Sequence, residues 1–237
     1  MRETRLTMGM PATVEIVNGT AADIDRIFAY FTEIDERFSP YKETSEVSRL
    51  NAGGQPESEE MRYILEQSER TCQETDGYFD IRHDGKIDPS GYVKGWAIQN
   101  AAERLASFVN YYVEIAGDLQ VGGRAEDGEP WKIGVRNPFN RDEIIKRVAL
   151  SDAGIATSGT AARGQHIYDP HGGAAQDIVS LTVIAPRIVD ADRFATGAFA
   201  MGTEGIKFIA RKEGLEGYMI DKDGLATFTP GFNRYVI

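Results

Sequence analysis

The stretch Asp190-Ala191-Asp192-Arg193-Phe194-Ala195-Thr196-Gly197 opens a Gly- and Ala-rich apolar segment that runs to about residue 210. Polar residues precede the segment and apolar residues follow, which is typical of the first turn of a buried helix. In a helix, Asp192 and Thr196 lie one turn apart, so their side-chain oxygens point to the same side. Mg²⁺ prefers such oxygen ligands and keeps room for water and phosphate. A structural alternative stays open, in which Asp190 or Asp192 caps the helix and Thr196 bonds back to a carbonyl.

The composition indicates a globular protein. The chain has 237 residues, of which 41% are hydrophobic, enough for a sizeable core. Its 26 basic and 37 acidic residues give a net charge of −11. This balance argues against a general nucleic-acid binder, because phosphate backbones require clustered Lys and Arg. A phosphate ligand is therefore expected to be bound locally, by a metal, a Gly-rich backbone or single basic residues.

The ends and the cysteine content predict a cytoplasmic protein. The start, Met-Arg-Glu-Thr-Arg-Leu-Thr-Met, has no apolar signal region, and no later run approaches the roughly 20 apolar residues of a membrane span. We therefore expect neither export nor membrane insertion. The single cysteine, Cys72, lies in a helical pattern beside acidic residues, so we expect it to be structural.

Hydrophobic periodicity predicts an α+β fold with a largely antiparallel sheet and helices packed outside it. The predicted helices cover residues 22–38, 59–74 and 96–107, with one short turn at 45–51. The predicted strands cover 12–17, 109–115, 119–122, 131–135, 147–151, 155–158, 180–184, 217–221 and 225–229. We expect the strands 119–122 and 131–135 to form a hairpin around a polar loop. No internal repeat or linker interrupts the chain, so a single domain over residues 1–237 is expected.

A series of short motifs carries the possible chemistry, although each alone has an ordinary explanation such as a turn or a strand end. The motifs are Met8-Gly9, Phe38-Ser39-Pro40-Tyr41, Ser45-Glu46-Val47-Ser48-Arg49-Leu50-Asn51, Thr75-Asp76-Gly77-Tyr78-Phe79-Asp80, Asp88-Pro89-Ser90-Gly91-Tyr92-Val93-Lys94-Gly95, Ala116-Gly117-Asp118-Leu119, Ala156-Thr157-Ser158-Gly159, His166-Ile167-Tyr168-Asp169-Pro170 and Ala191-Asp192…Thr196. In this order they resemble the ApbE family of FAD:protein FMN transferases. The resemblance spans about residues 8–232, nearly the whole chain.

The resemblance implies an ApbE-like, T-fold-related domain that binds FAD and Mg²⁺. Such an enzyme places FMN on a Thr or Ser hydroxyl of an acceptor flavoprotein and releases AMP. The family pattern assigns the metal to Asp192, Thr196 and a backbone oxygen at Gly91, a position we expect in a loop. The positions implied to line the FAD pocket are Met8, Tyr41, Tyr78, Phe79, Asp80, Asp88, Lys94 and Tyr168. Aromatic residues suit this task because flavin and adenine rings stack on apolar faces.

The chemistry of diphosphate cleavage assigns roles to some of these residues. Displacement at phosphorus depends on positioning and charge stabilisation, so a metal held by Asp192 and an ammonium group, which Lys94 provides, are the expected contributors. A hydroxyl nucleophile also gains from a general base, about 10²–10⁴-fold in rate. Of the three histidines, His166 is the best candidate base because it precedes the Tyr168-Asp169-Pro170 loop. The alternative, that His166 only shapes this loop, stays open.

One departure from the family pattern concerns the backbone. Ala116 replaces the first glycine of the usual Gly-Gly-Asp motif. Three functions remain open on the sequence: a protein-flavinylating transferase, which the resemblance favours; a Mg²⁺-dependent FAD diphosphatase with water as the nucleophile; and a non-catalytic flavin carrier. A carrier has no need of a metal at the diphosphate, so Asp192, Thr196 and Lys94 argue against the last of these.

Overall fold

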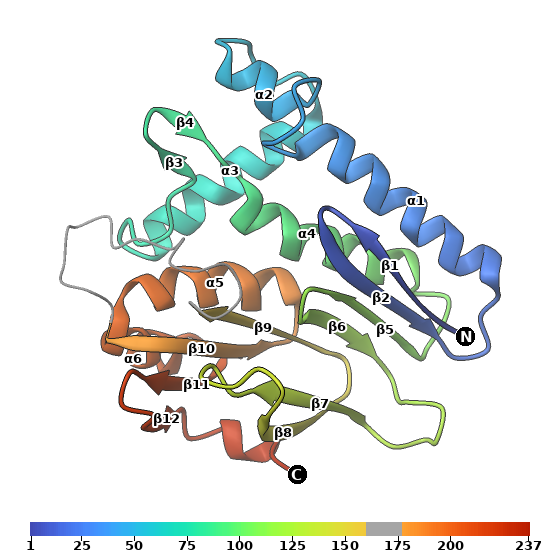
Figure 1. The fold of residues 1–237 in the computed structure, drawn as a ribbon, viewed down its shortest axis with the longest axis vertical. Coiled ribbons are helices and arrows are strands. Elements are labelled where there is room, and N and C mark those ends of the chain that lie inside the picture. Colours follow the sequence, from blue (N-terminus) through green and yellow to red (C-terminus); the bar gives the residue numbers. More distant parts are fainter. Residues whose placement is uncertain (160–176) are drawn as a thin grey trace.

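A computed structural model of the chain describes residues 1–159 and 177–237. Within these residues, eight strands form one sheet in which all neighbours are antiparallel (Figure 1). The order across the sheet is β1 (Arg2–Thr7), β2 (Met10–Ile16), β5 (Tyr111–Ile115), β6 (Asp118–Gly122), β9 (Ala153–Gly159), β10 (Ile178–Ala185), β11 (Glu216–Asp221) and β12 (Ala226–Phe228). The order passes directly from β2 to β5 and from β6 to β9. The elements between these strands in the sequence therefore lie outside the large sheet.

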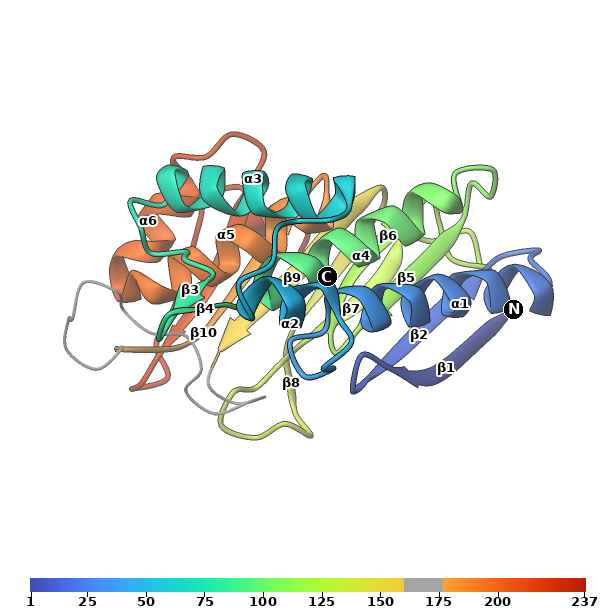
Figure 2. The same cartoon turned by 90° about the horizontal axis from the view of Figure 1, so that it is seen from above.

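Helices cover one face of the sheet (Figure 1 and Figure 2). They are α1 (Ala21–Phe38), α2 (Glu46–Asn51), α3 (Glu59–Glu74), α4 (Ser90–Arg104), α5 (Ile188–Ala200) and α6 (Gly205–Ala210). A short hairpin connects α3 to α4, and each of its strands, β3 (Arg82–His83) and β4 (Lys86–Ile87), has two residues. Phe31, Ile98 and Val183 are fully buried in the core between helices and sheet. In the described part of the chain, no helix is long and apolar enough to cross a bilayer.

The opposite face of the sheet carries a second hydrophobic core. The hairpin of β7 (Trp131–Arg136) and β8 (Ile144–Leu150) packs there, together with the 3-10 turn Phe232–Arg234. Ile184 belongs to this second core although its neighbour Val183 belongs to the first, because successive strand residues point to opposite faces. Helices, sheet and hairpin therefore form three layers, and the predicted α+β class is confirmed.

Local sequence signals explain the first helices. Thr20 begins α1 with a capping box, in which its hydroxyl accepts from the Asp23 N–H and Asp23 accepts in return from the Thr20 N–H. Ser58 caps α3 through the Met61 N–H at 3.0 Å. The helix predicted over 59–74 has these same bounds in the structure. Ser45 likewise caps α2, the short helical turn expected at 45–51.

The start of α4 was predicted too late. The helix begins at Ser90 rather than at residue 96, so Gly91 and Lys94 lie in its first turns and not in a loop. Asp88 supports this start by accepting a hydrogen bond from the Ser90 N–H at 3.0 Å. Neither Gly91 nor Gly95 serves a turn, since both lie within α4 and neither has a positive φ.

One prediction about a connection was wrong. The strands 119–122 and 131–135 do not form a hairpin, because β6 pairs with β5 and β9 in the large sheet while β7 pairs with β8. The helix predicted to begin near residue 190 is present as α5, but it does not extend through the whole apolar segment to residue 210. The segment breaks into α5, a 3-10 turn and α6 at Gly202, whose φ of +62° is incompatible with a continuous right-handed helix.

The turn between β5 and β6 gives a stability prediction. Ala116 has a φ of +53°, a left-handed conformation that costs a non-glycine residue about 1–2 kcal/mol. Glycine loses more entropy on folding, which offsets about 0.4–1 kcal/mol of the gain. We therefore expect Ala116→Gly to raise the free energy of unfolding by up to about 1 kcal/mol, measured by urea denaturation. The control Ala29→Gly, on the exposed side of α1, should lower it by about 1 kcal/mol. Destabilisation by both variants would contradict the prediction.

Candidate functional site

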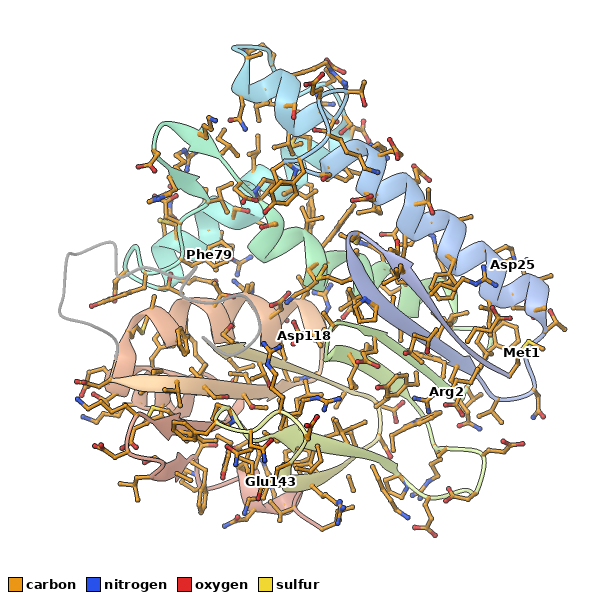
Figure 3. All side chains as sticks on the ribbon, viewed as in Figure 1. Met1, Arg2, Asp25, Phe79, Asp118 and Glu143 are labelled. Atoms are coloured by element: carbon orange, nitrogen blue, oxygen red, sulfur yellow. The ribbon has the colours of Figure 1, made fainter. Side chains whose placement is uncertain are left out.

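Three charged side chains meet where α4, α5 and β6 come together. We call Lys94, Asp118 and Asp192 the acid–lysine cluster. Figure 3 labels Asp118 near the centre of the molecule, where β6 meets the helices. The Lys94 ammonium forms an ion pair with Asp118 Oδ2, and its Nζ lies 3.4 Å from Asp192 Oδ1. The side chains of Asp118 and Asp192 are only 3% and 4% exposed, so the cluster is a buried site with one positive and two negative groups.

The Asp192 carboxylate is the unsatisfied member of this cluster. Among the described residues, no atom hydrogen-bonds its buried Oδ2. Burial raises the pKa of Asp192, although Lys94 opposes that shift, and the Asp118 carboxylate adds to it. A buried carboxylate oxygen without a partner is costly, and a bound cation is one way to compensate it.

Thr196 and Gly91 carry oxygen atoms of the kind that a hard cation binds. Thr196 lies one turn further along α5, and its Oγ1 is 3.4 Å from the Ser158 Oγ of β9. This separation exceeds that of a usual hydroxyl–hydroxyl bond, so Thr196 keeps acceptor capacity for another partner. Gly91 in the first turn of α4 offers a backbone carbonyl, which has two lone pairs. Asp192 Oδ2, Thr196 and the Gly91 carbonyl therefore fit the ligand chemistry of Mg²⁺.

The candidate ligands include only one carboxylate. No group of three or more His, Cys, Asp or Glu side chains in residues 1–159 and 177–237 could hold a metal ion. Mg²⁺ commonly binds through one or two carboxylates and completes its shell with water and substrate phosphate. A single carboxylate would therefore leave coordination positions on a bound Mg²⁺ for water and for phosphate oxygens.

Glycines and a buried amide fix the position of α5. A methyl group on Gly95 of α4 would lie 2.8 Å from Asp192 Cβ, so only glycine allows this approach. A methyl group on Gly154 of β9 would lie 2.5 Å from Ile188 N, the first residue of α5. Gln120 of β6 accepts a hydrogen bond from the Ile188 N–H at 2.8 Å and so binds one of the free N–H groups at the helix start. The capping role considered for Asp190 and Asp192 is therefore not what begins this helix.

A second set of contacts joins α5 to the end of α3. Arg193 pairs with Glu74, and its Nη1 donates to Thr71 Oγ1 at 3.1 Å. A methyl group on Gly197 would lie 2.8 Å from the Thr75 side chain, so this glycine permits close packing. These contacts fix the start of the segment Thr75-Asp76-Gly77-Tyr78-Phe79-Asp80 against the helix that carries Asp192.

Comparison with known proteins identifies the family. The family model described as "ApbE family" matches residues 8–84 and 81–219. The chain belongs to the ApbE family. Curated relatives include the FAD:protein FMN transferase of Escherichia coli strain K12, 32% identical over 167 residues, and that of Vibrio cholerae O395, 33% identical over 162. These alignments cover 64% and 63% of this chain but 48% and 47% of the relatives, so the chain spans about half their length.

Solved ApbE structures share the fold. The flavin transferase ApbE from Vibrio cholerae superposes with a TM-score of 0.87 at 23% identity, covering 99% of this chain and 98% of that chain. The ApbE protein of Thermotoga maritima gives a TM-score of 0.87 at 22% identity, with coverage of 99% and 98%. At this level of identity the likeness establishes the architecture, and it confirms the predicted ApbE-like fold.

The residues taken from the ApbE pattern fall into separate places. Lys94 and Asp192 meet in the acid–lysine cluster. Phe79 is buried, and its ring lies next to Gly91: a methyl group added to Gly91 would be 3.6 Å from Phe79 Cε2. Figure 3 labels Phe79 beside the end of α3. Others come from elements that do not carry the cluster, or lie on the surface. These are Met8 in the β1–β2 turn, Tyr41 after α1, with 89% of its surface exposed, and Tyr78, Asp80 and Asp88 between α3 and α4.

Two predicted residues, His166 and Tyr168, lie outside the described residues, so their roles stay predictions.

Asp118 was quoted in a motif but was not assigned a role. Its signal is an acid at the first position of the strand Asp-Leu-Gln-Val-Gly, in which no other residue is charged. A carboxylate there becomes buried with the strand and needs a cationic partner, which Lys94 provides.

Proposed function

We propose that this protein is a Mg²⁺-dependent FAD:protein FMN transferase that modifies a Thr or Ser hydroxyl of an acceptor flavoprotein and releases AMP. One observation carries the proposal: the unpartnered, buried Asp192 Oδ2, with Thr196 one turn away and the Lys94 ammonium beside it. This combination of a cation site and a fixed positive charge suits a diphosphate ligand. Membership of the ApbE family and the activity named for its curated relatives support the same function.

The proposed reaction is a displacement at one phosphorus atom. The acceptor hydroxyl oxygen forms a bond to the FMN phosphorus of FAD, and the bond from that phosphorus to the bridging oxygen breaks. AMP leaves with the bridging oxygen, and the hydroxyl proton passes to a base. We assign this base role to His166. If water replaces the acceptor hydroxyl, the same displacement gives free FMN and AMP.

The chain's own residues bind and orient the substrate. Asp192, Thr196 and the Gly91 carbonyl would hold Mg²⁺, which when bound neutralises charge on the diphosphate oxygens. Lys94 adds a positive charge, and its ion pair with Asp118 fixes the position of the ammonium group. We assign the FAD pocket to Met8, Tyr41, Tyr78, Phe79, Asp80, Asp88 and Tyr168 together with Lys94. The burial of the acid–lysine cluster strengthens these electrostatic interactions because water screens them less.

The test is incubation of the pure protein with FAD and Mg²⁺, with and without a peptide that contains an Asp-Gly-Ala-Thr segment. A gain of one FMN in the intact mass of the peptide, with AMP released, is the expected result. A matched peptide with Val in place of Thr should gain nothing, and EDTA should abolish the reaction. Release of AMP and FMN without an adduct would identify a diphosphatase instead. Flavin binding without AMP release under any condition would identify a carrier.

A further inference from the structure

Asp118 is held rigidly on one side of the acid–lysine cluster. Its Oδ1 accepts a hydrogen bond from the Thr157 N–H of β9 at 2.8 Å, which fixes the carboxylate against the backbone of a neighbouring strand. Its Oδ2 takes the ion pair from Lys94. Because the residue is 2% exposed and belongs to a strand of the large sheet, its short side chain has less conformational freedom than that of Lys94. Lys94 must therefore come to Asp118.

The two carboxylates share the lysine unequally. Asp118 forms the short contact, whereas Asp192 Oδ1 lies 3.4 Å from Nζ and Asp192 Oδ2 lacks a hydrogen-bond partner in the described part of the chain. A lysine ammonium and a divalent cation compete for the same carboxylate, because both are attracted by its charge. The position of the Lys94 ammonium therefore determines how strongly the Asp192 carboxylate can attract a metal.

We propose that Asp118 is a positioning residue, which retains Lys94 and so keeps Asp192 available to Mg²⁺. The inference rests on the proposed function and deepens its account of the cation site. Without the Asp118 charge, the ammonium would have Asp192 as its remaining partner in the cluster and would occupy the carboxylate that the metal needs. Asp118→Asn is the suitable variant, because an Asn oxygen still accepts from the Thr157 N–H while the negative charge is lost.

The test measures Mg²⁺ binding without flavin, by isothermal titration calorimetry and by the Mg²⁺-dependent shift of Tm. The proteins are the parent, Asp118→Asn, Lys94→Gln and the double variant. We expect Asp118→Asn to raise the Mg²⁺ concentration for half-saturation at least tenfold. Lys94→Gln should lower it, since the competing ammonium is gone. In the Lys94→Gln background, Asp118→Asn should change it by threefold or less, because only the through-space effect of one charge remains.

Distinct outcomes would overturn the inference. If the Mg²⁺ concentration for half-saturation of Asp118→Asn lies within twofold of that of the parent, Asp118 does not keep Asp192 available. An equal weakening with and without Lys94 means that Asp118 acts through its own charge and not through the lysine. Weaker Mg²⁺ binding by Lys94→Gln than by the parent would also overturn the inference, because it means that the ammonium does not compete with the metal. If Asp118→Asn fails to fold, the Lys94→Gln result alone tests the inference. A parent protein that shows no Mg²⁺ response contradicts the metal site of the proposed function as well.

Discussion

Asp192→Asn is expected to abolish FMN transfer while leaving the fold intact. A metal that stabilises transition-state charge contributes several kcal/mol, and each 1.4 kcal/mol is tenfold in rate, so we expect a loss of about 10³-fold or more in kcat/KM. The substitution keeps the shape of the side chain. It also converts the acid–lysine cluster from two negative groups and one positive to a neutral pair, Lys94 with Asp118.

The stability of this variant gives an independent readout. The Asp192 side chain is only 4% exposed, and this burial raises the pKa of its carboxyl group, so removing its charge should leave Tm in the absence of Mg²⁺ unchanged or higher. Asp190→Asn is the matched control, two residues earlier in α5. Asp190 pairs with Arg193 at 2.9 Å and lies outside the cluster, so turnover should stay within about threefold and the free energy of unfolding within about 1 kcal/mol. Full activity of Asp192→Asn would refute the metal assignment.

Gly95→Ala is expected to be the most damaging conservative change in α4. Alanine is a better helix former than glycine by about 1 kcal/mol, so a helix surface position would gain stability. Here the added methyl group would lie 2.8 Å from Asp192 Cβ and 3.0 Å from its Oδ2, and 3.2 Å from Val189 Cα. Such overpacking costs about 1–3 kcal/mol and forces α4 and α5 apart. A displacement of about 1 Å at a catalytic group costs about 10²-fold in rate, so we expect at least this loss in kcat/KM.

Gly91→Ala, one turn earlier in the same helix, provides the control for stability. A methyl group there would lie 3.6 Å from Phe79 Cε2, which is an ordinary van der Waals contact. Urea denaturation should therefore show Gly91→Ala equal to or more stable than the parent and Gly95→Ala less stable. If both variants were stabilised, the close approach of α4 to α5 would be wrong.

Much of the architecture followed from periodicity. The apolar stripe of α1 and the bounds of α3 were predicted because caps and helical spacing lie within one segment. β1 was missed because its sequence, Arg-Glu-Thr-Arg-Leu-Thr, is mostly polar. It is an edge strand, and its register places Arg2 opposite Glu15 of β2, with the two side chains 3.1 Å apart. That cross-strand pair becomes visible only once the partner strand is known.

The candidate site was predicted in part. The sequence singled out Asp192 and Lys94, and the structure brings them within 3.4 Å. It did not predict the role of Asp118, because the partner of a buried acid lies 24 residues away and depends on how β6 faces α4. Gly95 was placed just before the helix predicted over 96–107, since a glycine needed for helix packing and one at a helix entry look the same in a single sequence. Pairing across elements, not local propensity, determines both.

The separation of the two cores has a practical consequence for handling the protein. The β7–β8 hairpin lies on the face of the sheet opposite the helices that carry Lys94 and Asp192. The loop before it turns at Gly128, whose φ is +79°, and the adjoining Asp127 is exposed. An Asp127→Cys variant would therefore offer an attachment point for a fluorophore or a solid support on the side of the molecule away from the acid–lysine cluster. Immobilised in this way, the protein would present its helical face to the solution.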